Sequence, residues 1–241
     1  FIDRSITEKT KLSLGHLLSF EDLSNVEPDV IISPLDTGSL RFSTLSSSLT
    51  YDQRDNAVIP TSGYYGSLDL GVSQKSIGSE ANFLSAGTQF AFYYPLPLDA
   101  PLTLANNTRI AGLFGISGTD EIPLSQRFFM GGHSTVRGFR ENSLGPKGSE
   151  GNVIGGDLSV LNNIELQYLL YQNIQLAAFF DIGSVFLQSQ NLSTSDLRES
   201  AGIAARLLTP IGSIGIDVGF PLDQRKDESA TRFHFNIGAQ F

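Results

Sequence analysis

Cysteine and tryptophan are absent from this 241-residue chain, and charged residues make up only 17% of it. A chain without cysteine suits an oxidising compartment, where stray thiols are a hazard, although the absence alone identifies no compartment. Basic residues are also scarce. The chain has 16 Lys and Arg but 25 Asp and Glu, so its formal net charge is -9. Phosphate binding needs clustered Lys and Arg, and no such cluster is present, so we expect no nucleic-acid partner.

Long apolar runs are missing as well. Although 40% of the residues are hydrophobic, no run approaches the roughly 20 consecutive apolar residues that a membrane-spanning helix needs. The sequence therefore excludes insertion into a membrane by helices. The chain starts at Phe1 with neither a start methionine nor a charged and then apolar leader, so we expect a processed product or a piece of a longer chain.

Signals for catalysis, cofactors and metals are incomplete. His16, His133 and His234 are scattered without metal-ligand spacing, so we expect no metal site. The glycine-rich stretch around Gly132 lacks the final glycine of a nucleophile elbow and the Gly-Lys-Ser/Thr ending of a phosphate cradle. We therefore expect a protein that is not an enzyme, with no catalytic residue and no cofactor.

What the chain does contain is a hydrophobic period of two. From Arg232 to Phe241, the odd positions are mostly large and apolar, and the even positions are polar or small. Alternation of this kind gives a β-strand one apolar face and one polar face. Repeated along the chain, it predicts about ten strands, near residues 5–20, 39–54, 61–76, 81–96, 101–115, 152–172, 173–188, 195–209, 210–221 and 230–241.

The connections between these segments alternate in length. Short joints lie near 56–61, 95–101, 172–173 and 209–212, whereas the stretches 21–38, 76–80, 116–151, 188–195 and 222–229 tend to be longer and more polar. Membrane barrels have short turns on one side and long loops on the other. A soluble β-sandwich shares the alternation of apolar and polar residues, so this alternative stays open at this step.

Two features favour the membrane barrel. Small residues line the polar faces of the strands, together with Asp69, Arg109, Glu165, Asp181, Arg206 and Asp217. Aromatic residues such as Tyr64 and Tyr168 lie near many strand ends, as in the interfacial girdles of membrane barrels, and a sandwich would not need them there. We therefore predict an all-β fold, a transmembrane antiparallel β-barrel in which residues 1–241 form a single domain.

One stretch interrupts the alternation. Residues 127–139 read Arg-Phe-Phe-Met-Gly-Gly-His-Ser-Thr-Val-Arg-Gly-Phe, and the glycines let a loop fold tightly. With residues 142–147 and 155–157, this stretch resembles the signature loop of the bacterial outer-membrane assembly factors of the BamA and TamA group. Two-partner secretion transporters and organelle import barrels share the Val-Arg-Gly-aromatic core more loosely. Residues 52–63, 179–185 and 233–241 resemble further motifs of the same group, in the same order.

The resemblance implies a role for named residues. The loop, placed at 116–151, would fold back into the lumen, and Arg137 would pair with Glu165 and Asp181 on neighbouring strands. The alternation agrees, because both acids belong to polar faces, and a guanidinium can bridge carboxylates with its planar set of donors. The alternative is a solvated surface loop whose arginine does nothing. The resemblance also marks the loop residues Gly131, Gly132, Val136, Gly138 and Phe139, and the C-terminal signal residues Phe235, Gly238 and Phe241 of the strand 230–241.

The barrels of this family are larger than the ten strands predicted for this chain. Family barrels have about sixteen strands, an even number as in other bacterial barrels, so the chain would supply the last ten, or else form a reduced barrel. We expect residues 1–241 to contain none of the periplasmic repeat domains that usually precede the barrel in this family. Because an unpaired edge in lipid is prohibitive, we expect the strand near 5–20 to pair with the strand ending at Phe241, with another copy, or with strands outside this sequence.

These expectations lead to one main function and two alternatives. The main hypothesis is assembly or translocation of proteins by an integral barrel of the bacterial outer membrane whose seam opens to a client strand. The partners would be outer-membrane lipids, unfolded outer-membrane proteins or a secreted substrate, and periplasmic accessory proteins that bind upstream domains. The alternatives are an export pore for one dedicated substrate, and a barrel that anchors an enzyme preceding Phe1.

Overall fold

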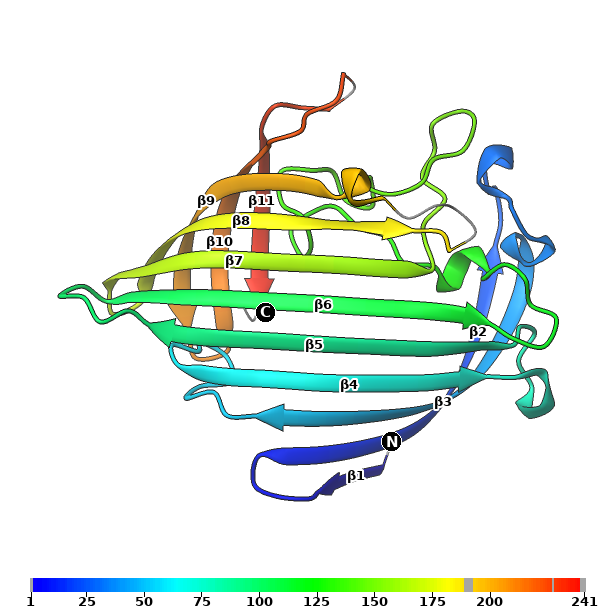
Figure 1. Cartoon of the computed structure of the whole chain (residues 1–241), viewed down its shortest axis with the longest axis horizontal. Helices are drawn as coiled ribbons and strands as arrows, with labels where there is room; N and C mark the ends of the chain where they lie inside the picture. The colour runs from blue at the N-terminus through cyan, green and yellow to red at the C-terminus, as the bar shows by residue number, and fades with distance from the viewer. Residues whose placement is uncertain (1, 189–192, 227, 239–241) are drawn as a thin grey trace.

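The computed structural model describes residues 2–188, 193–226 and 228–238, which form one antiparallel sheet (Figure 1). Its strands are hydrogen-bonded in chain order, each to the next. They are β1 (Ile2–Ser5), β2 (Thr10–Leu23), β3 (Gly38–Asp52), β4 (Gly63–Ser73), β5 (Phe83–Pro95), β6 (Leu102–Gly115), β7 (Leu158–Tyr171), β8 (Ile174–Phe186), β9 (Arg198–Thr209), β10 (Gly212–Pro221) and β11 (Arg232–Gly238).

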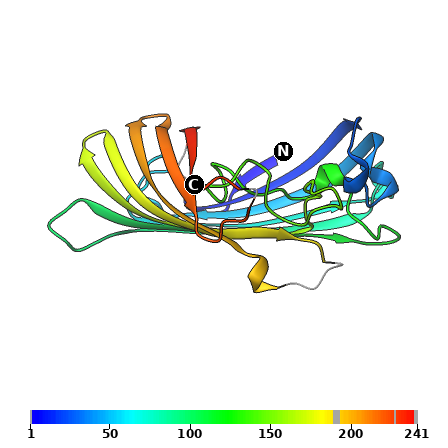
Figure 2. The same ribbon diagram turned by 90° about the horizontal axis from the view of Figure 1, so that it is seen from above.

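The sheet forms an open trough. Seen from above, it curves upward at both ends, and the long connection between β6 and β7 lies on its concave side (Figure 2). Strong twist and curvature of this kind are what closing a sheet into a barrel requires. In the described part of the chain, β1 and β11 are the two edges and do not pair with each other.

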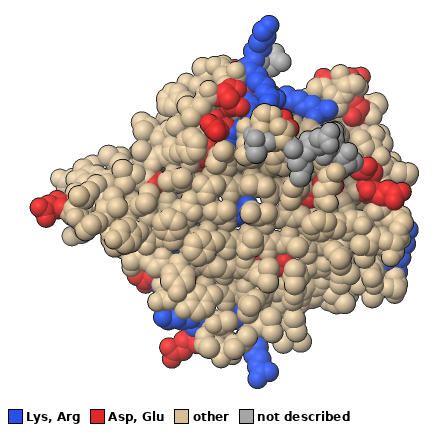
Figure 3. All heavy atoms as spheres, in the orientation of Figure 1, with Lys and Arg blue, Asp and Glu red and all other residues tan. Residues whose placement is uncertain are grey.

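The alternation in the sequence sorts side chains between the two faces. On β11, Phe233, Phe235 and Ile237 are 75%, 63% and 72% exposed, whereas His234 between them is only 9% exposed. The convex face is accordingly apolar, and Figure 3 shows charged side chains gathered mainly along its margins. An apolar outer band of this kind is what a barrel presents to lipid.

Short helices occur only in the connections. They are five 3-10 helices within the described ranges, at Pro28–Val30, Pro34–Asp36, Lys75–Ile77, Leu124–Gln126 and Thr194–Asp196. Among these residues no helix is long and apolar enough to cross a membrane.

Several strand boundaries differ from the sequence-based prediction, including those of three segments. The segment 5–20 is interrupted after β1, because the Thr7 hydroxyl accepts the N–H groups of Lys9 and Thr10 and closes a turn. The segment 152–172 starts as a strand only at Leu158, since the preceding residues belong to the long loop. In the segment 230–241, β11 covers Arg232–Gly238, and Phe241 lies outside the described residues.

The turn between β3 and β4 shows why the short joints are tight. Asp55 Oδ1 accepts the backbone N–H groups of Asn56, Thr61 and Ser62 at 2.9, 2.9 and 3.1 Å. A short acidic side chain can thus replace the backbone partners that a turn lacks. Gly63, with φ +97°, then returns the chain to β4 in a conformation that favours glycine.

Candidate functional site

The connection between β6 and β7, residues 116–157, folds back onto the concave face of the sheet (Figure 2). Its apolar residues form a buried cluster with the strands below: Met130, Val136, Phe139, Leu144, Leu161 and Val185, each at most 2% exposed. Burial of these side chains removes apolar surface from water and holds the loop against the concave face of the sheet. We refer to residues 116–157 as the inner loop.

Glycines allow the inner loop to turn and to approach the wall closely. Gly131 and Gly132 have φ values of +106° and +103°, where side chains are strained. Gly138, with φ +90°, lies against β10, and a Cβ added at Gly219 would be only 2.5 Å from its backbone nitrogen. Two glycines are therefore needed where the loop touches β10.

Arg137 lies in a buried ionic cluster between the inner loop and the wall. Its Nε and Nη2 donate to the two Asp181 carboxylate oxygens at 2.8 and 2.7 Å, and Nη1 donates to Glu165 Oε1 at 2.5 Å. Exposure is 3% for Arg137, 1% for Glu165 and 0% for Asp181. The guanidinium also lies over the Phe179 ring, 3.6 Å from its centroid. The three residues identified by resemblance are thus in direct contact.

Two further members, Arg206 on β9 and Asp217 on β10, complete this cluster. Arg206 donates to both Glu165 oxygens at 2.7 Å. Asp217 Oδ2 lies 3.6 Å from Arg137 Nη1, and Asp217 Oδ1 lies 3.8 Å from Arg206 Nη2. The alternation placed both side chains inside, but without the sheet register nothing in the sequence linked them to Arg137.

Amide side chains add hydrogen bonds to the two carboxylates that Arg137 contacts. Asn163 Nδ2 donates to Asp181 Oδ1 and to the Thr135 carbonyl, both at 2.8 Å. Gln167 donates to Glu165 Oε2 at 2.8 Å. Buried charges are tolerated when they are paired and hydrogen-bonded in this way. The cluster therefore joins the inner loop to β7, β8, β9 and β10.

A second buried ion pair fixes the start of the inner loop. Arg127 Nη2 donates to the Asp36 oxygens at 2.8 and 2.7 Å, and both side chains are 0% exposed. Asp36 lies in the β2–β3 connection, 91 residues away in sequence. Arg127 also donates to the carbonyls of Ile122 and Ile154. This pair could not be predicted from the sequence, because neither the alternation nor the signature motif gives Asp36 a partner.

The carboxylate of Asp36 also accepts hydrogen bonds from the backbone. Its oxygens accept the backbone N–H groups of Ile32, Ser33 and Leu124 at 2.8, 2.9 and 2.8 Å. Nearby, Asp29 accepts the Glu150 N–H at 3.0 Å and the Asn152 amide at 2.9 Å. The β2–β3 connection therefore contacts two separate parts of the inner loop, residues 124–127 and 150–152.

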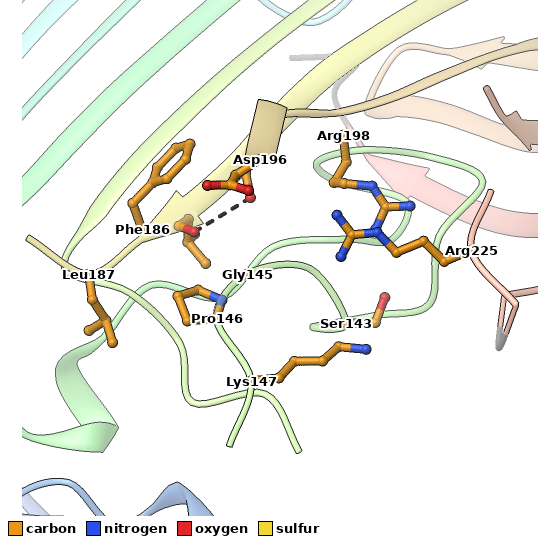
Figure 4. Close-up of a pocket in the computed structure, with 11 residues that line it drawn as sticks. Ser143, Gly145, Pro146, Lys147, Phe186, Leu187, Asp196, Arg198 and Arg225 are labelled. Carbon is orange, nitrogen blue, oxygen red and sulfur yellow. Dashed lines mark hydrogen bonds between the residues drawn. The ribbon is translucent and has the colours of Figure 1, made fainter. Parts of the chain in front are cut away.

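The returning arm of the inner loop borders a cavity of about 160 Å³ beside the end of β8 (Figure 4). Arg198 and Arg225 converge on it, and Lys147 lies on the opposite side. Arg198 lies 4.7 Å from the Phe139 ring centroid and pairs with Asp223 and Glu228, at 2.5 and 2.7 Å. Phe139 of the signature motif is thereby covered by a neutralised cation.

The C-terminal strand contacts the inner loop through the inward residue His234, and its inward residue Asn236 contacts the ionic cluster. His234 Nε2 accepts the Gly138 N–H at 3.1 Å, and Asn236 donates to Asp217 Oδ2 at 3.1 Å. Phe235 points outward and is 63% exposed, and Gly238, with φ +140°, is the last described residue. Phe241, the third predicted signal residue, lies outside the described residues.

The remaining histidines lie apart from this cluster. His16 contacts Ser43, and His133 contacts Glu141. Across residues 2–188, 193–226 and 228–238, no group of three or more His, Asp or Glu side chains could hold a metal ion.

Comparison with known proteins gives matches over the whole chain. The model of the Omp85 superfamily domain matches residues 1–241. The outer membrane protein assembly factor BamA of Nitratidesulfovibrio vulgaris is 29% identical over 198 residues, 80% of this chain and 25% of that protein. BamA of Neisseria meningitidis is 28% identical over 223 residues, 79% of this chain and 28% of that protein. The chain thus spans about a quarter of the length of these relatives.

The fold is shared with a solved structure. The crystal structure of BamA from Haemophilus ducreyi lacking POTRA domains 1-3 superimposes with a TM-score of 0.78 at 23% identity, over 97% of this chain and 52% of that one. This likeness shows the transmembrane β-barrel fold, to which the curved sheet of this chain corresponds. The chain belongs to the Omp85 superfamily.

Proposed function

We propose that this barrel assists the insertion of unfolded proteins into a bacterial outer membrane. The family and the relatives named as outer membrane protein assembly factors support this proposal. The observation that carries it is the inner loop docked on the concave face by Arg137. Its partners would be outer-membrane lipids, unfolded outer-membrane proteins, and accessory proteins on the periplasmic side.

The chemistry required is strand pairing, with no covalent step. In the described part of the chain β11 pairs with β10 alone, so its other edge presents backbone N–H and C=O groups. In a bilayer such groups need partners, because each unsatisfied one costs several kcal/mol. A client segment can supply them by adding as a strand along this edge. The apolar convex face would meanwhile keep the barrel in lipid.

The ionic cluster would hold the inner loop in one position while the edge changes partners. Removing one member of a buried, paired cluster costs about 3–5 kcal/mol, because the remaining charge is left uncompensated. Lysine cannot replace Arg137 fully, since an ammonium lacks the planar donors that contact both Glu165 and Asp181. The loop position is therefore expected to depend on arginine itself.

The first experiment compares R137A with R137K in the intact protein, reconstituted into lipid vesicles with an unfolded outer-membrane protein. We expect R137A to slow client folding at least tenfold, with R137K between R137A and wild type. The matched control is R140A, because Arg140 lies in the same loop but is exposed. A barrel that resists heat unfolding like wild type, and still folds clients at the wild-type rate with R137A, would contradict the proposal.

The same experiment separates insertion from export. The relatives named as assembly factors favour insertion over a pore for one dedicated substrate or a barrel that anchors an enzyme. An export pore would conduct ions when its substrate binds and would leave client folding unchanged.

A further inference from the structure

One inward side chain of the edge strand β11, His234, contacts the inner loop, and a second, Asn236, contacts Asp217 of the ionic cluster on β10. In the described part of the chain, β11 is held in the sheet only by its pairing with β10, from Ser213↔Gly238 to Gly219↔Arg232. His234 adds a contact outside this ladder, because its Nε2 accepts the N–H of Gly138 at 3.1 Å. Asn236 adds a second one, to Asp217 Oδ2 at 3.1 Å.

Both contacts end on the residues that anchor the loop. Gly138 directly follows Arg137, whose own backbone N–H donates to Asp181 at 3.0 Å. Asp217, which receives the Asn236 amide, lies 3.6 Å from Arg137 Nη1. The segment Arg137–Gly138 is therefore bound to β8 on one side and to β11 on the other.

The geometry makes the His234 contact sensitive to movement of either partner. His234 is 9% exposed, and Gly138 is buried. Gly219 leaves no side chain between the loop and β10, so the loop backbone lies directly on this strand. If β11 moved outward while the loop stayed, the Gly138 N–H would lose its acceptor in a buried place, which is unfavourable.

We propose that His234, supported by Asn236, is a positioning residue that couples the inner loop to β11. A docked loop holds β11 against β10, and outward movement of β11 releases Gly138. Coupling of this kind is reciprocal, so an undocked loop loosens β11 to the same extent. The inference rests on the proposed function only in that β11 is the strand a client would meet.

The test measures hydrogen exchange of the β10 and β11 amides in the intact protein, in lipid bilayers and without a client. We expect H234L to accelerate exchange of residues 213–219 and 232–238 by roughly five- to tenfold, the effect of losing one buried hydrogen bond. H234Q retains an acceptor and should restore most of the protection. H16L is the matched control, because His16 contacts Ser43 on β3 and not the inner loop.

A double variant tests the coupling itself. R137A alone should accelerate exchange in β11 as H234L does, and H234L added to R137A should have little further effect. Wild-type exchange in H234L, or fully additive effects of H234L and R137A, would overturn the inference. Because no client is present, coupled exchange in a protein that fails to fold clients would contradict the proposed function and leave this inference standing.

Discussion

Removing Arg127 should loosen the contact between the β2–β3 connection and the inner loop. In R127A the Asp36 carboxylate stays buried without its cation, and breaking a buried pair in this way costs about 3–5 kcal/mol. Three backbone N–H groups still donate to Asp36, so we expect the lower end, about 3 kcal/mol. At 1.4 kcal/mol per tenfold, this corresponds to an opening equilibrium shifted by roughly 100-fold.

The assay is hydrogen exchange of residues 24–37 and 122–127 in the intact protein, combined with limited proteolysis of the same segments. Exchange there should accelerate by about two orders of magnitude, while strands β7 and β8 keep their protection. K11A is the control, because Lys11 and Asp3 form an ion pair about half exposed, at 49% and 50%, and exposed pairs contribute little. Exchange in R127A within threefold of wild type would refute the reasoning.

Two further predictions concern the close approach to β10 and acid sensitivity. G219A should destabilise the docked loop by about 1–3 kcal/mol, because the added methyl group forces the two backbones apart. G66A is the control, because a Cβ at Gly66 meets no atom nearer than 3.9 Å. Equal urea midpoints for the two variants would contradict this prediction. The hydrogen bond from Asn152 lowers the pKa of Asp29 below its ordinary 3.8, so the contact stabilises the loop above that pH and is lost as the pH falls further. Hydrogen exchange of residues 148–152, corrected for its intrinsic pH dependence, should accelerate in wild type as the pH falls below 3.8. The D29N variant should not show this acceleration.

Local physical rules were sufficient for most of the strands and for the direction of their side chains. Alternation placed Glu165, Asp181, Arg206 and Asp217 on the inner face, because successive side chains on a strand point to opposite sides. The family resemblance, which alternation alone could not supply, then connected Arg137 with the first two. The confirmed fold, an all-β transmembrane barrel, follows from the same alternation together with the family match.

The contacts that were not predicted join residues that lie far apart in the sequence. Asp36 and Arg127 meet only because two connections fold over the same region, and no periodicity encodes this. Arg206 and Asp217 reach the cluster through the sheet register, and a shift of the register by two residues would keep every side chain on its face while changing its neighbours. The turn at Thr7 divides a segment that is otherwise continuous, since one hydroxyl accepts two backbone N–H groups.

Arg137 holds the inner loop on the concave face of the sheet through Asp181. A double-mutant cycle of R137A and D181A on the free energy of unfolding, measured by reversible urea titration in detergent micelles, tests this contact most directly. We expect a coupling free energy of at least about 1.5 kcal/mol, as for close, buried charge pairs. Additive effects, within about 0.5 kcal/mol, would show that the two residues do not interact in the folded barrel and would contradict the account.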